Sequence, residues 1–506
     1  MERHIGIWYK EGHPESKEVG ELIIDGNSID FLCRFHGEVF PCAFIGNDGE
    51  FDYKVFVNGQ SYPHFSKTVD HTSSYRVYYV LMKEFEFSKG IEIEEINDFS
   101  FTIPEIIQWL GNNTVSYGFT NSDEIGAYEN NMESIILNET DPHIEICFES
   151  KTLDYSFTHN DSISKMVKQE PRIKVVYEKS QNIKTVIDDI ECLMQFFGLL
   201  MGSVNSANDI RLSVGIENKN KKSWLYLNYD FSYNTKAFDP FSIPRTYLYV
   251  VNDKLPLYYI SWREFYFEDR FSLLRRIYFS TNNKKDYFIE EQFIQYMRII
   301  DGYQTRISGG ETTRHMLRAA IKTATKDIKR LIFTDEGKPI FENSIKSVLP
   351  DWKFNSSHVE DIAGWIASGY IAKKSLASRL QELDDMYLSI IRENAVYIEN
   401  QSKDPCEVNS MTEEEIIQLY YKELGDTRNY YSHYKMDKSG VLENNKLLDS
   451  VNVLKATIIS IFFSHMNMER ELIRHIMAFD SELRFQTKCL RNENDKPFKR
   501  PCEATT

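Results

Sequence analysis

Residues 426–434 read DTRNYYSHY and bring several reactive side chains together in a short stretch. Arg428 carries a permanently charged, planar guanidinium that can bind two oxygens of a phosphate. His433 titrates near neutral pH and can therefore take up or release a proton. The residues between them offer an amide (Asn429), two phenols and a hydroxyl, which are hydrogen-bonding groups rather than the aliphatic chains of a core face. This set suits metal-free cleavage of RNA, in which the 2′-hydroxyl is the nucleophile.

The spacing of Arg428 and His433 is by itself a weak indicator of a site. Chance supplies roughly 0.5 such pairs in a chain of this composition. A second pair, Arg470 and His475 in RELIRH, has ordinary helical neighbours, and we interpret it as structural. On a straight helix five residues turn about 500°, which leaves the two side chains about 140° apart. They can meet at one ligand only if the helix bends or if a second chain completes the site.

RNA transesterification needs a base and an acid, whereas one copy of the motif supplies one histidine. Two copies that face each other across a symmetric dimer would supply both groups. The competing interpretation is structural: Tyr430, Tyr431 and Tyr434 pack, while Arg428 and His433 cap the end of their helix. The adjacent amide and hydroxyl favour a site, because capping does not need them.

The helix that leads into the motif has a clear predicted start. Thr412 is followed three residues later by Glu415, which is the pattern of a capping box. The predicted core face of this helix comprises Ile416, Ile417, Tyr420, Tyr421 and Leu424. Gly425 then weakens the helix directly before the motif. We therefore expect the motif at a helix end or a kink.

The region around this helix is predicted to be helical throughout, from residue 288 to 485. Apolar residues recur there at helical spacing, which predicts a bundle of about five or six helices. The three clearest stripes are Ile289, Phe293, Tyr296, Met297 and Ile300; Leu376, Leu380, Leu383, Tyr387, Ile390 and Ile391; and Leu447, Val451, Leu454, Ile458, Ile461 and Phe462. Residues 486–506 have no such periodicity and are predicted to be disordered.

The amino-terminal part has a different pattern. Residues 1–180 contain runs of β-branched and aromatic residues separated by DG, NDG and NG, which are hairpin signals. They predict a β-rich, sandwich-like domain. Residues 181–287 contain one helix and a second β segment that completes or adjoins this domain. The predicted fold class is therefore α+β and multidomain, with a β-rich amino-terminal region followed by an all-α bundle.

Composition limits the class of protein. A chain of 506 residues is expected to form two or three domains. Its formal net charge of −17 argues against unspecific coating of nucleic acid, although a local basic site remains compatible. The seven cysteines lack CxxC spacing, which indicates no zinc ribbon or disulfide framework and favours a reducing compartment. With neither a signal peptide nor a membrane-length apolar run, we expect a cytoplasmic protein. We expect no cofactor or metal, because SGGETT at 308–313 lacks the Lys-Ser/Thr of a phosphate loop, and His64 and His71 have no third ligand in the sequence around them.

A basic stripe lies within the predicted helical region. Positive residues recur at every fourth position from Arg314 to Arg330, where each like-charged pair costs about 0.2–0.5 kcal/mol on a helix. Bound RNA would offset that cost, whereas the alternative is a solvated helix face. The RNA-binding candidates are therefore Arg314, Arg318, Lys322 and Lys326 of this stripe, with Tyr430 and Tyr434 of the motif.

DTRNYYSHY resembles the R-N-x3-H signature of the HEPN ribonucleases, and it lies late in a helical region, as in that family. The run IGIWYKEGHPESKEVGELIIDGNSIDFLCRFHG and the later FTIPEIIQWLG resemble the amino-terminal domain of ApeA-type anti-phage HEPN proteins. The resemblance implies catalytic roles for three residues. Arg428 would bind the scissile phosphate, Asn429 would orient that phosphate or His433, and His433 would transfer the proton.

The resemblance also implies what the whole protein does. HEPN nucleases are metal-independent dimers that cut RNA to a 2′,3′-cyclic phosphate and a 5′-hydroxyl, and the defence enzymes commonly act as toxins that cut tRNA and halt the infected cell. The β-rich region would be the sensor or regulator that responds to a phage-derived trigger. HEPN sites often include an acidic residue from another helix, for which Glu290, Glu291 and Asp301 are candidates.

Two other classes of function compete with the ribonuclease. In one, the same bundle forms a non-catalytic dimeric module that holds RNA or a protein partner. In the other, a ligand-binding β-sandwich uses the helices only to oligomerise. The role of His433 separates these alternatives, because only the ribonuclease needs its proton transfer.

Overall fold

A computed structural model describes the larger part of the chain, as two compact units. The described residues are 1–25, 28–33, 43–66, 69–84, 95–111, 133–156, 163–202, 206–214, 223–228, 243–283, 288–307, 322–347, 375–402, 411–433, 438–480 and 483. The first unit comprises Met1–Ser272, Arg276–Tyr287 and Ile459–Thr506, and the second comprises Leu273–Arg275 and Phe288–Ile458. Three predicted features, Arg314 with Arg318, Tyr434, and the tail 486–506, lie outside the described residues.

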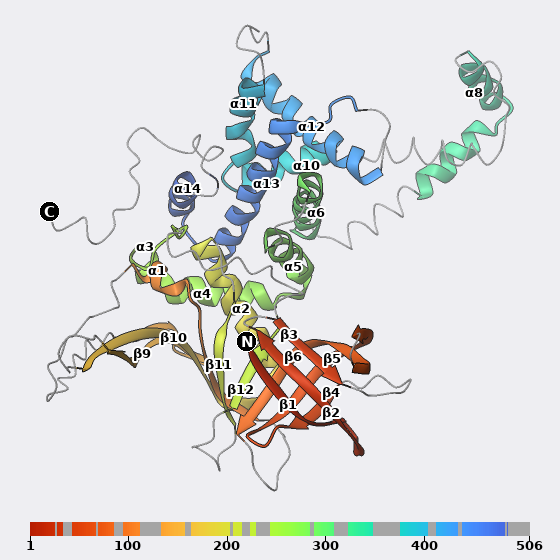
Figure 1. Ribbon diagram of the computed structural model, residues 1–506. Coiled ribbons are helices and arrows are strands. Elements are labelled where there is room, and N and C mark those ends of the chain that lie inside the picture. Colours follow the sequence, from red (N-terminus) through yellow and green to blue (C-terminus); the bar gives the residue numbers. More distant parts are fainter. Residues whose placement is uncertain are drawn as a thin grey trace, which may run out of the picture. The chain divides into compact units, whose positions relative to one another are not determined.

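The first unit is built on a single antiparallel sheet in the order β3-β2-β1-β4-β5-β6-β12-β11-β7-β10-β9-β8 (Figure 1). Its strands are β1 (Glu2–Lys10), β2 (His13–Asp25), β3 (Ser28–Cys33), β4 (Ala43–Asn47), β5 (Phe51–Ser66), β6 (Val69–Glu84), β7 (Ile96–Thr102), β8 (Ile135–Asn138), β9 (His143–Ser156), β10 (Ile163–Gln181), β11 (Asn208–Val214) and β12 (Ser223–Leu227). The predicted β-rich amino-terminal region is confirmed. The second β segment, β11 and β12, lies within this same sheet.

The long strand β6 decides how the sheet is arranged. Residues 73–76 of β6 pair with β3, which closes β1–β6 into a barrel. Residues 79–83 of the same strand pair with β12 instead, from which the rest of the sheet extends as an open layer. The sequence predicted the strands but suggested a sandwich of two sheets, whereas they form one sheet that partly closes on itself.

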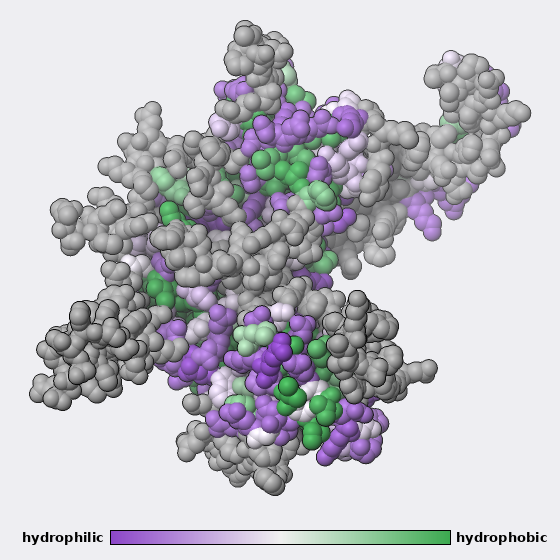
Figure 2. All heavy atoms as spheres, in the orientation of Figure 1, coloured by the Kyte–Doolittle hydropathy of each residue, from purple (hydrophilic) through white to green (hydrophobic). Residues whose placement is uncertain are grey.

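Aromatic side chains fill the barrel. Trp8 is fully buried, its indole N–H donates to the Gly20 carbonyl over 3.1 Å, and its ring packs edge-on against Phe31. A Cβ atom at Gly46 would overlap the indole, so glycine is needed where β4 passes the ring. Three apolar residues on the outer side of the barrel are each more than half exposed: Ile5, Ile7 and Val19. Figure 2 shows hydrophobic surface among hydrophilic surface over β1 and β2.

Helices complete the first unit. They are α1 (Ile106–Leu110), α2 (Ile183–Met201), α3 (Leu248–Val251), the short 3-10 helix Asn252–Lys254, α4 (Leu255–Phe267), most of α5 (Asp269–Asn283) and α14 (Arg470–Phe479). The Asn182 side chain caps the start of α2, and Gly202, at φ 85°, ends it. Helix α2 packs on β7, and the Trp262 indole of α4 donates to the Cys192 carbonyl of α2 over 3.1 Å.

The second unit is helical, as the sequence predicted. Its labelled helices are α6 (Ile289–Ile307), α8 (Gly337–Lys346), α10 (Leu376–Met386), α11 (Ile390–Ser402), α12 (Glu413–His433) and the first part of α13 (Asn444–His465), and residues 322–332 are also helical. The apolar stripe from Leu376 to Ile391 belongs to two helices. Helix α10 ends before Tyr387, and Ser389, with a φ of 55°, precedes the start of α11. The buried Asp384 side chain accepts from the Ile391 and Arg392 amides and so caps α11.

Helix α13 has residues in both units, with the division between Ile458 and Ile459. The predicted stripe from Leu447 to Phe462 is buried. Among the described helices α13 alone is long and apolar enough to cross a membrane, but most of that apolar stretch is buried, as in a core helix.

Candidate active site

The predicted start of α12 is confirmed in detail. The Thr412 amide donates to the Glu415 carboxylate over 2.8 Å, and the Glu415 amide donates to the Thr412 hydroxyl over 3.3 Å. This reciprocal pair lowers the pKa of Glu415, chiefly through the amide hydrogen bond. The five residues of the predicted core face, Ile416, Ile417, Tyr420, Tyr421 and Leu424, are all buried.

Two buried tyrosines fix α12 to its neighbours. Tyr421 donates to the Asp384 carboxylate over 2.8 Å, and Tyr420 lies 2.7 Å from the Ser450 hydroxyl of α13. Burial raises the pKa of Asp384 to about 6, although two backbone amides and Tyr421 donate to it. Burial, followed by the charge of Asp384, raises the pKa of Tyr421 as well. Buried hydrogen bonds of Tyr420 and Tyr421 therefore hold the helix that carries the motif against α13 and α10.

Helix α12 continues through Gly425 without a break and ends at His433. Gly425 is buried, and an added Cβ atom would meet only Leu376, at ordinary van der Waals distances of 3.9 and 4.0 Å. Thr427, two residues later, is fully buried and accepts from the Leu442 amide over 2.8 Å, which anchors the following segment. The motif therefore occupies the last two turns of an uninterrupted helix, so it lies at a helix end.

Arg428 contacts two of the residues that the sequence singled out. Its guanidinium donates to the Asn429 side-chain carbonyl over 3.2 Å. A second guanidinium nitrogen lies 3.9 Å from a carboxylate oxygen of Asp301, on α6. Of the three acidic candidates, Asp301 is thus the one that contacts the motif arginine. Glu291 is exposed, while Glu290 adds to the effect of burial in raising the pKa of Tyr431.

Asp301 also forms an ion pair with Arg379 of α10, through its other carboxylate oxygen. Three helices, α6, α10 and α12, therefore meet at one carboxylate that two guanidiniums share. Sequence reasoning missed Arg379, because no motif contains it and its contact joins residues far apart in the chain. Its place beside the buried Leu380 at the start of α10 gave the only signal, a basic residue next to a core face.

The comparisons with known families match both parts of the chain. Residues 3–262 match the family model ApeA N-terminal domain 1, and residues 294–472 match the model Apea-like HEPN. The chain belongs to the ApeA-type HEPN proteins. No curated protein and no solved structure matches it. The two domains indicate an anti-phage defence protein with a nuclease-like domain, because HEPN domains are generally ribonucleases that bind RNA and dimerise.

In this ApeA-type HEPN protein, His433 is the last residue of α12 and is exposed. Tyr430 and Tyr431, one turn earlier, are half-buried and their rings pack edge to face, 5.1 Å between centroids. An exposed imidazole at a helix end can approach a ligand or a second chain, whereas helical geometry points it about 140° away from Arg428. Within one chain Arg428 and His433 therefore face different directions.

The basic stripe is only partly described. Lys322 and Lys326 are exposed on the helix over residues 322–332, and Arg330 forms an ion pair with Asp327 at 3.7 Å. Such exposed pairs contribute little to stability, typically about 0.2–1 kcal/mol. Because they are exposed, the two lysines can reach an anionic ligand, and their binding of RNA stays a prediction.

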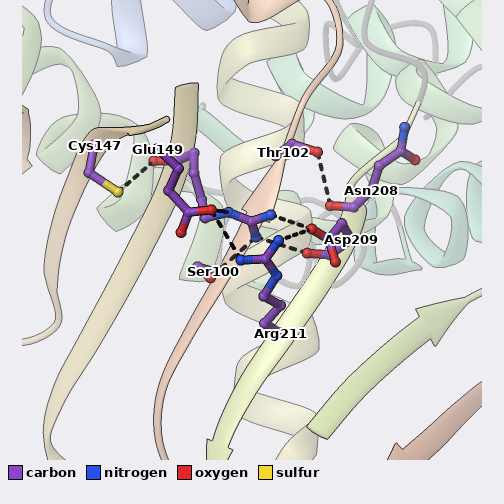
Figure 3. Close-up of polar contacts among 8 residues, drawn as sticks. Ser100, Thr102, Cys147, Glu149, Asn208, Asp209 and Arg211 are labelled. Carbon is purple, nitrogen blue, oxygen red and sulfur yellow. Dashed lines mark hydrogen bonds and ion pairs between the residues drawn. The ribbon is translucent and has the colours of Figure 1, made fainter. Parts of the chain in front are cut away.

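A second cluster of arginines lies on the open part of the sheet, in the ApeA amino-terminal domain (Figure 3). Arg172, which is 1% exposed, contacts Glu149 and Asp209, and Arg211 bonds the same two carboxylates at 3.1 and 2.6 Å. The Arg172 guanidinium also donates to the Ser100 hydroxyl and the Asp209 carbonyl. Two acids match two bases here, so this cluster joins β9, β10 and β11 and leaves no excess charge for a ligand. The described residues contain no group of three or more His, Cys, Asp or Glu side chains placed to hold a metal ion.

Proposed function

We propose that this chain is a metal-independent endoribonuclease of anti-phage abortive-infection defence, that it works in the cytoplasm as a homodimer, and that tRNA is its substrate. The observation that carries the proposal is the arrangement of Arg428 at the end of α12, with Asn429 bonded to it and Asp301 of α6 beside it. A guanidinium fixed in this way presents a preorganised phosphate site. The exposed His433 at the same helix end supplies an imidazole, which can accept and donate a proton.

The proposed reaction is an internal transesterification. The 2′-hydroxyl oxygen attacks the adjacent phosphorus, and the bond from phosphorus to the 5′-oxygen breaks. One His433 accepts the proton of the 2′-hydroxyl, and His433 of the partner subunit donates a proton to the leaving 5′-oxygen. Arg428 stabilises the extra negative charge on the phosphorus oxygens, and Asn429 orients Arg428 through their hydrogen bond. The products are a 2′,3′-cyclic phosphate and a 5′-hydroxyl, with atoms and protons in balance.

The dimer follows from the direction of the side chains. Because Arg428 and His433 point about 140° apart on one helix, a single copy cannot direct both at one phosphate. Two α12 ends related by a two-fold axis place one chain's arginine beside the other chain's histidine. The β-rich first unit is then the sensor or regulator, since a ribonuclease without control would damage its own cell. A phage-derived component is the proposed trigger.

The full-length protein and its His433→Ala variant, incubated with end-labelled RNA, test the proposal. We expect cleavage with 5′-hydroxyl ends by the wild-type chain and a loss of about 10²-fold or more in the variant. His475→Ala, in the other Arg–His pair, is the matched control and should cut like the wild type. Equal cleavage by the His433→Ala chain would overturn the nuclease proposal. Binding of RNA by the wild type without any cleavage would favour the non-catalytic HEPN module instead.

The identity of the substrate needs a separate measurement. Induced expression in bacteria, followed by sequencing of new 5′-hydroxyl ends, should show ends concentrated in tRNA. Growth should slow with the wild-type chain and continue with the His433→Ala chain. Ends spread uniformly over all transcripts would contradict a tRNA substrate while leaving the ribonuclease activity intact.

A further inference from the structure

The cluster around Asp301 carries more positive charge than its single carboxylate can balance. Arg379 and Arg428 each contact one oxygen of Asp301. Neither guanidinium contacts another acidic group among the described residues, and the remaining partner of Arg428 is the neutral Asn429. At neutral pH the cluster therefore has one uncompensated positive charge, in a chain whose formal net charge is −17. A local excess of this kind attracts an anion.

The three side chains are placed where an anion can reach them. Arg379 and Arg428 are each 28% exposed and Asp301 is 23% exposed, so all three reach the surface but are partly held by their neighbours. A guanidinium has five N–H donors, of which Arg379 uses one to bond Asp301 and Arg428 uses one to bond Asn429. The contact of Arg428 with Asp301, at 3.9 Å, is an ion pair and too long for a hydrogen bond. Among the described residues no hydrogen bond uses the other donors, which leaves them for phosphate oxygens.

The packing of α10 does not depend on Arg379. The helix starts at Ser375, whose hydroxyl accepts from the Ser378 amide over 3.1 Å, and Leu380 and Leu383 are buried in the core. Tyr387, directly after α10, lies 2.5 Å from the Tyr303 hydroxyl of α6 and so joins the same two helices as the ion pair. A second contact between α6 and α10 is thus already present. The structural need for an arginine at this position is small.

We propose that Arg379 is a second phosphate-binding residue of the HEPN site, and that Asp301 positions it together with Arg428. The ligand class is single-stranded RNA, contacted at two backbone phosphates, with Arg428 on the scissile phosphate and Arg379 on a neighbouring one. Two guanidiniums on opposite oxygens of one carboxylate are held apart, which suits successive phosphates of a chain better than one free phosphate. The inference rests on the proposed function in taking RNA as the ligand and in assigning the scissile phosphate to Arg428.

The test measures RNA binding rather than cleavage. The His433→Ala full-length chain is the background, so that RNA stays intact, and a fluorescent single-stranded oligoribonucleotide is the probe in anisotropy titrations at several salt concentrations. Loss of one phosphate contact on single-stranded RNA lowers the slope of log K against log salt by about 0.7. We expect this decrease for Arg379→Ala, with affinity lower by roughly 10-fold at low salt. Arg379→Lys should restore most of the slope, because a lysine also neutralises a phosphate.

Two controls separate binding from folding. Arg392→Ala removes a half-buried arginine of α11 that pairs with Glu414 at 2.6 Å, and its slope and affinity should stay those of the background. Arg379→Gln retains the length and polarity of the side chain, so it tests the charge if the alanine variant unfolds on heating at a lower temperature. A purely structural Arg379 would lower the melting temperature and leave the salt slope unchanged.

The outcomes are distinguishable from those of the proposed function. An unchanged slope in both Arg379→Ala and Arg379→Gln overturns the inference, even if the wild-type chain cuts RNA. Failure of the His433→Ala chain to bind the oligoribonucleotide at any salt concentration also overturns it. If instead the wild-type chain never cuts RNA but the Arg379 variants lose the slope, the second phosphate site stands and the nuclease proposal falls.

Discussion

The chain contains the same Arg–His spacing twice, at the end of α12 and within α14, and the two surroundings differ. At Arg428 the neighbours are an amide on the same helix and Asp301 from another helix. Around Arg470, which is exposed, the contacts within α14 include Arg474 with Glu471 over 3.1 Å and the His475 ring with Phe479 at 4.9 Å. The distant Lys254 pairs with the preceding residue, Glu469, and not with the arginine. The difference lies in what distant helices bring to the arginine.

This comparison shows what identifies a site in a chain of this kind. Helical spacing repeats by chance, whereas a carboxylate supplied by another helix requires a specific fold. Asp301 of α6 contacts both Arg428 of α12 and Arg379 of α10, so charged side chains from three helices meet at the end of α12. Helix α14 is instead fixed by structural pairs at its two ends, Lys254 with Glu469 and Arg245 with Asp480.

The largest expected difference between the two segments is the effect of removing the arginine. Arg428→Ala should lower RNA cleavage by at least about 10²-fold, because the charge that stabilises the transition state is lost. Arg470→Ala should leave the cleavage rate within about twofold of the wild type, since Arg470 is exposed and substitutions of exposed surface residues usually have small effects. Initial rates on end-labelled RNA measure both, with light scattering to follow the dimer. A loss of dimer in Arg428→Ala would instead support a packing role for the motif.

The second comparison concerns the acidic partner. Asp301→Asn should lower cleavage by roughly 10- to 100-fold, because Arg428 and Arg379 lose the charge that holds them and small displacements are costly in catalysis. Glu471→Gln is the matched control in α14, where the carboxylate is 83% exposed and pairs with Arg474. Single-turnover rates are the measurement. Equal activity of the Asp301→Asn and wild-type chains would remove the distinction between the two segments.

The third comparison concerns the support of α12. The pKa of Asp384 is raised from the usual 3.8 to about 6 by burial, so the folded chain retains a proton that the unfolded chain has already released. The free energy of unfolding should therefore fall as pH rises from about 4 to 6, by about 3 kcal/mol from this group. Asp384→Asn should flatten that part of the pH profile in urea unfolding. Asp385→Asn, at an exposed neighbour whose charge adds least to the raised pKa of Asp384, should change that part of the profile only slightly.

The smallest expected effect is that of a substitution at Gly425. Helix α14 contains no corresponding glycine. Gly425→Ala should raise the free energy of unfolding by about 0.5–1 kcal/mol, because alanine favours a helix and the new methyl group meets only Leu376 at contact distance. Calorimetry of the full chain measures the shift, and RNA cleavage should stay close to that of the wild type. Higher stability with lost cleavage would mean that the reaction needs α12 to bend at this glycine.

Features that depend on neighbouring residues were predictable from the sequence. The capping box at Thr412 and the core face of α12 are confirmed because both follow from residues within a few turns. The β-rich and helical regions are confirmed for the same reason. The kink considered at Gly425 is absent, since packing against α10 outweighs a propensity of about 1 kcal/mol.

Features that depend on distant residues were not predictable. The apolar stripe continues from Leu380 to Ile391 although the helix breaks between them, because the break keeps both helices facing the core. Pairing of β3 with β6 and of Arg379 with Asp301 joins segments whose proximity no periodicity encodes. Periodicity tells which face of an element is buried but leaves its partner open. The motif was therefore visible in the sequence, whereas the contacts of Asp301 with Arg428 and Arg379 were not.

Helix α13 has a consequence for how such proteins can exchange parts during evolution. Its final turns belong to the first unit, where Phe462 packs against Trp262, Phe265 and Tyr278. Recombination that joins the amino-terminal half of one relative to the helical half of another would set this phenylalanine among unfamiliar aromatic neighbours. Because these ring contacts of Phe462 lie within the first unit, a hybrid that keeps them would have to take residues 459–480 from the same parent as the amino-terminal half.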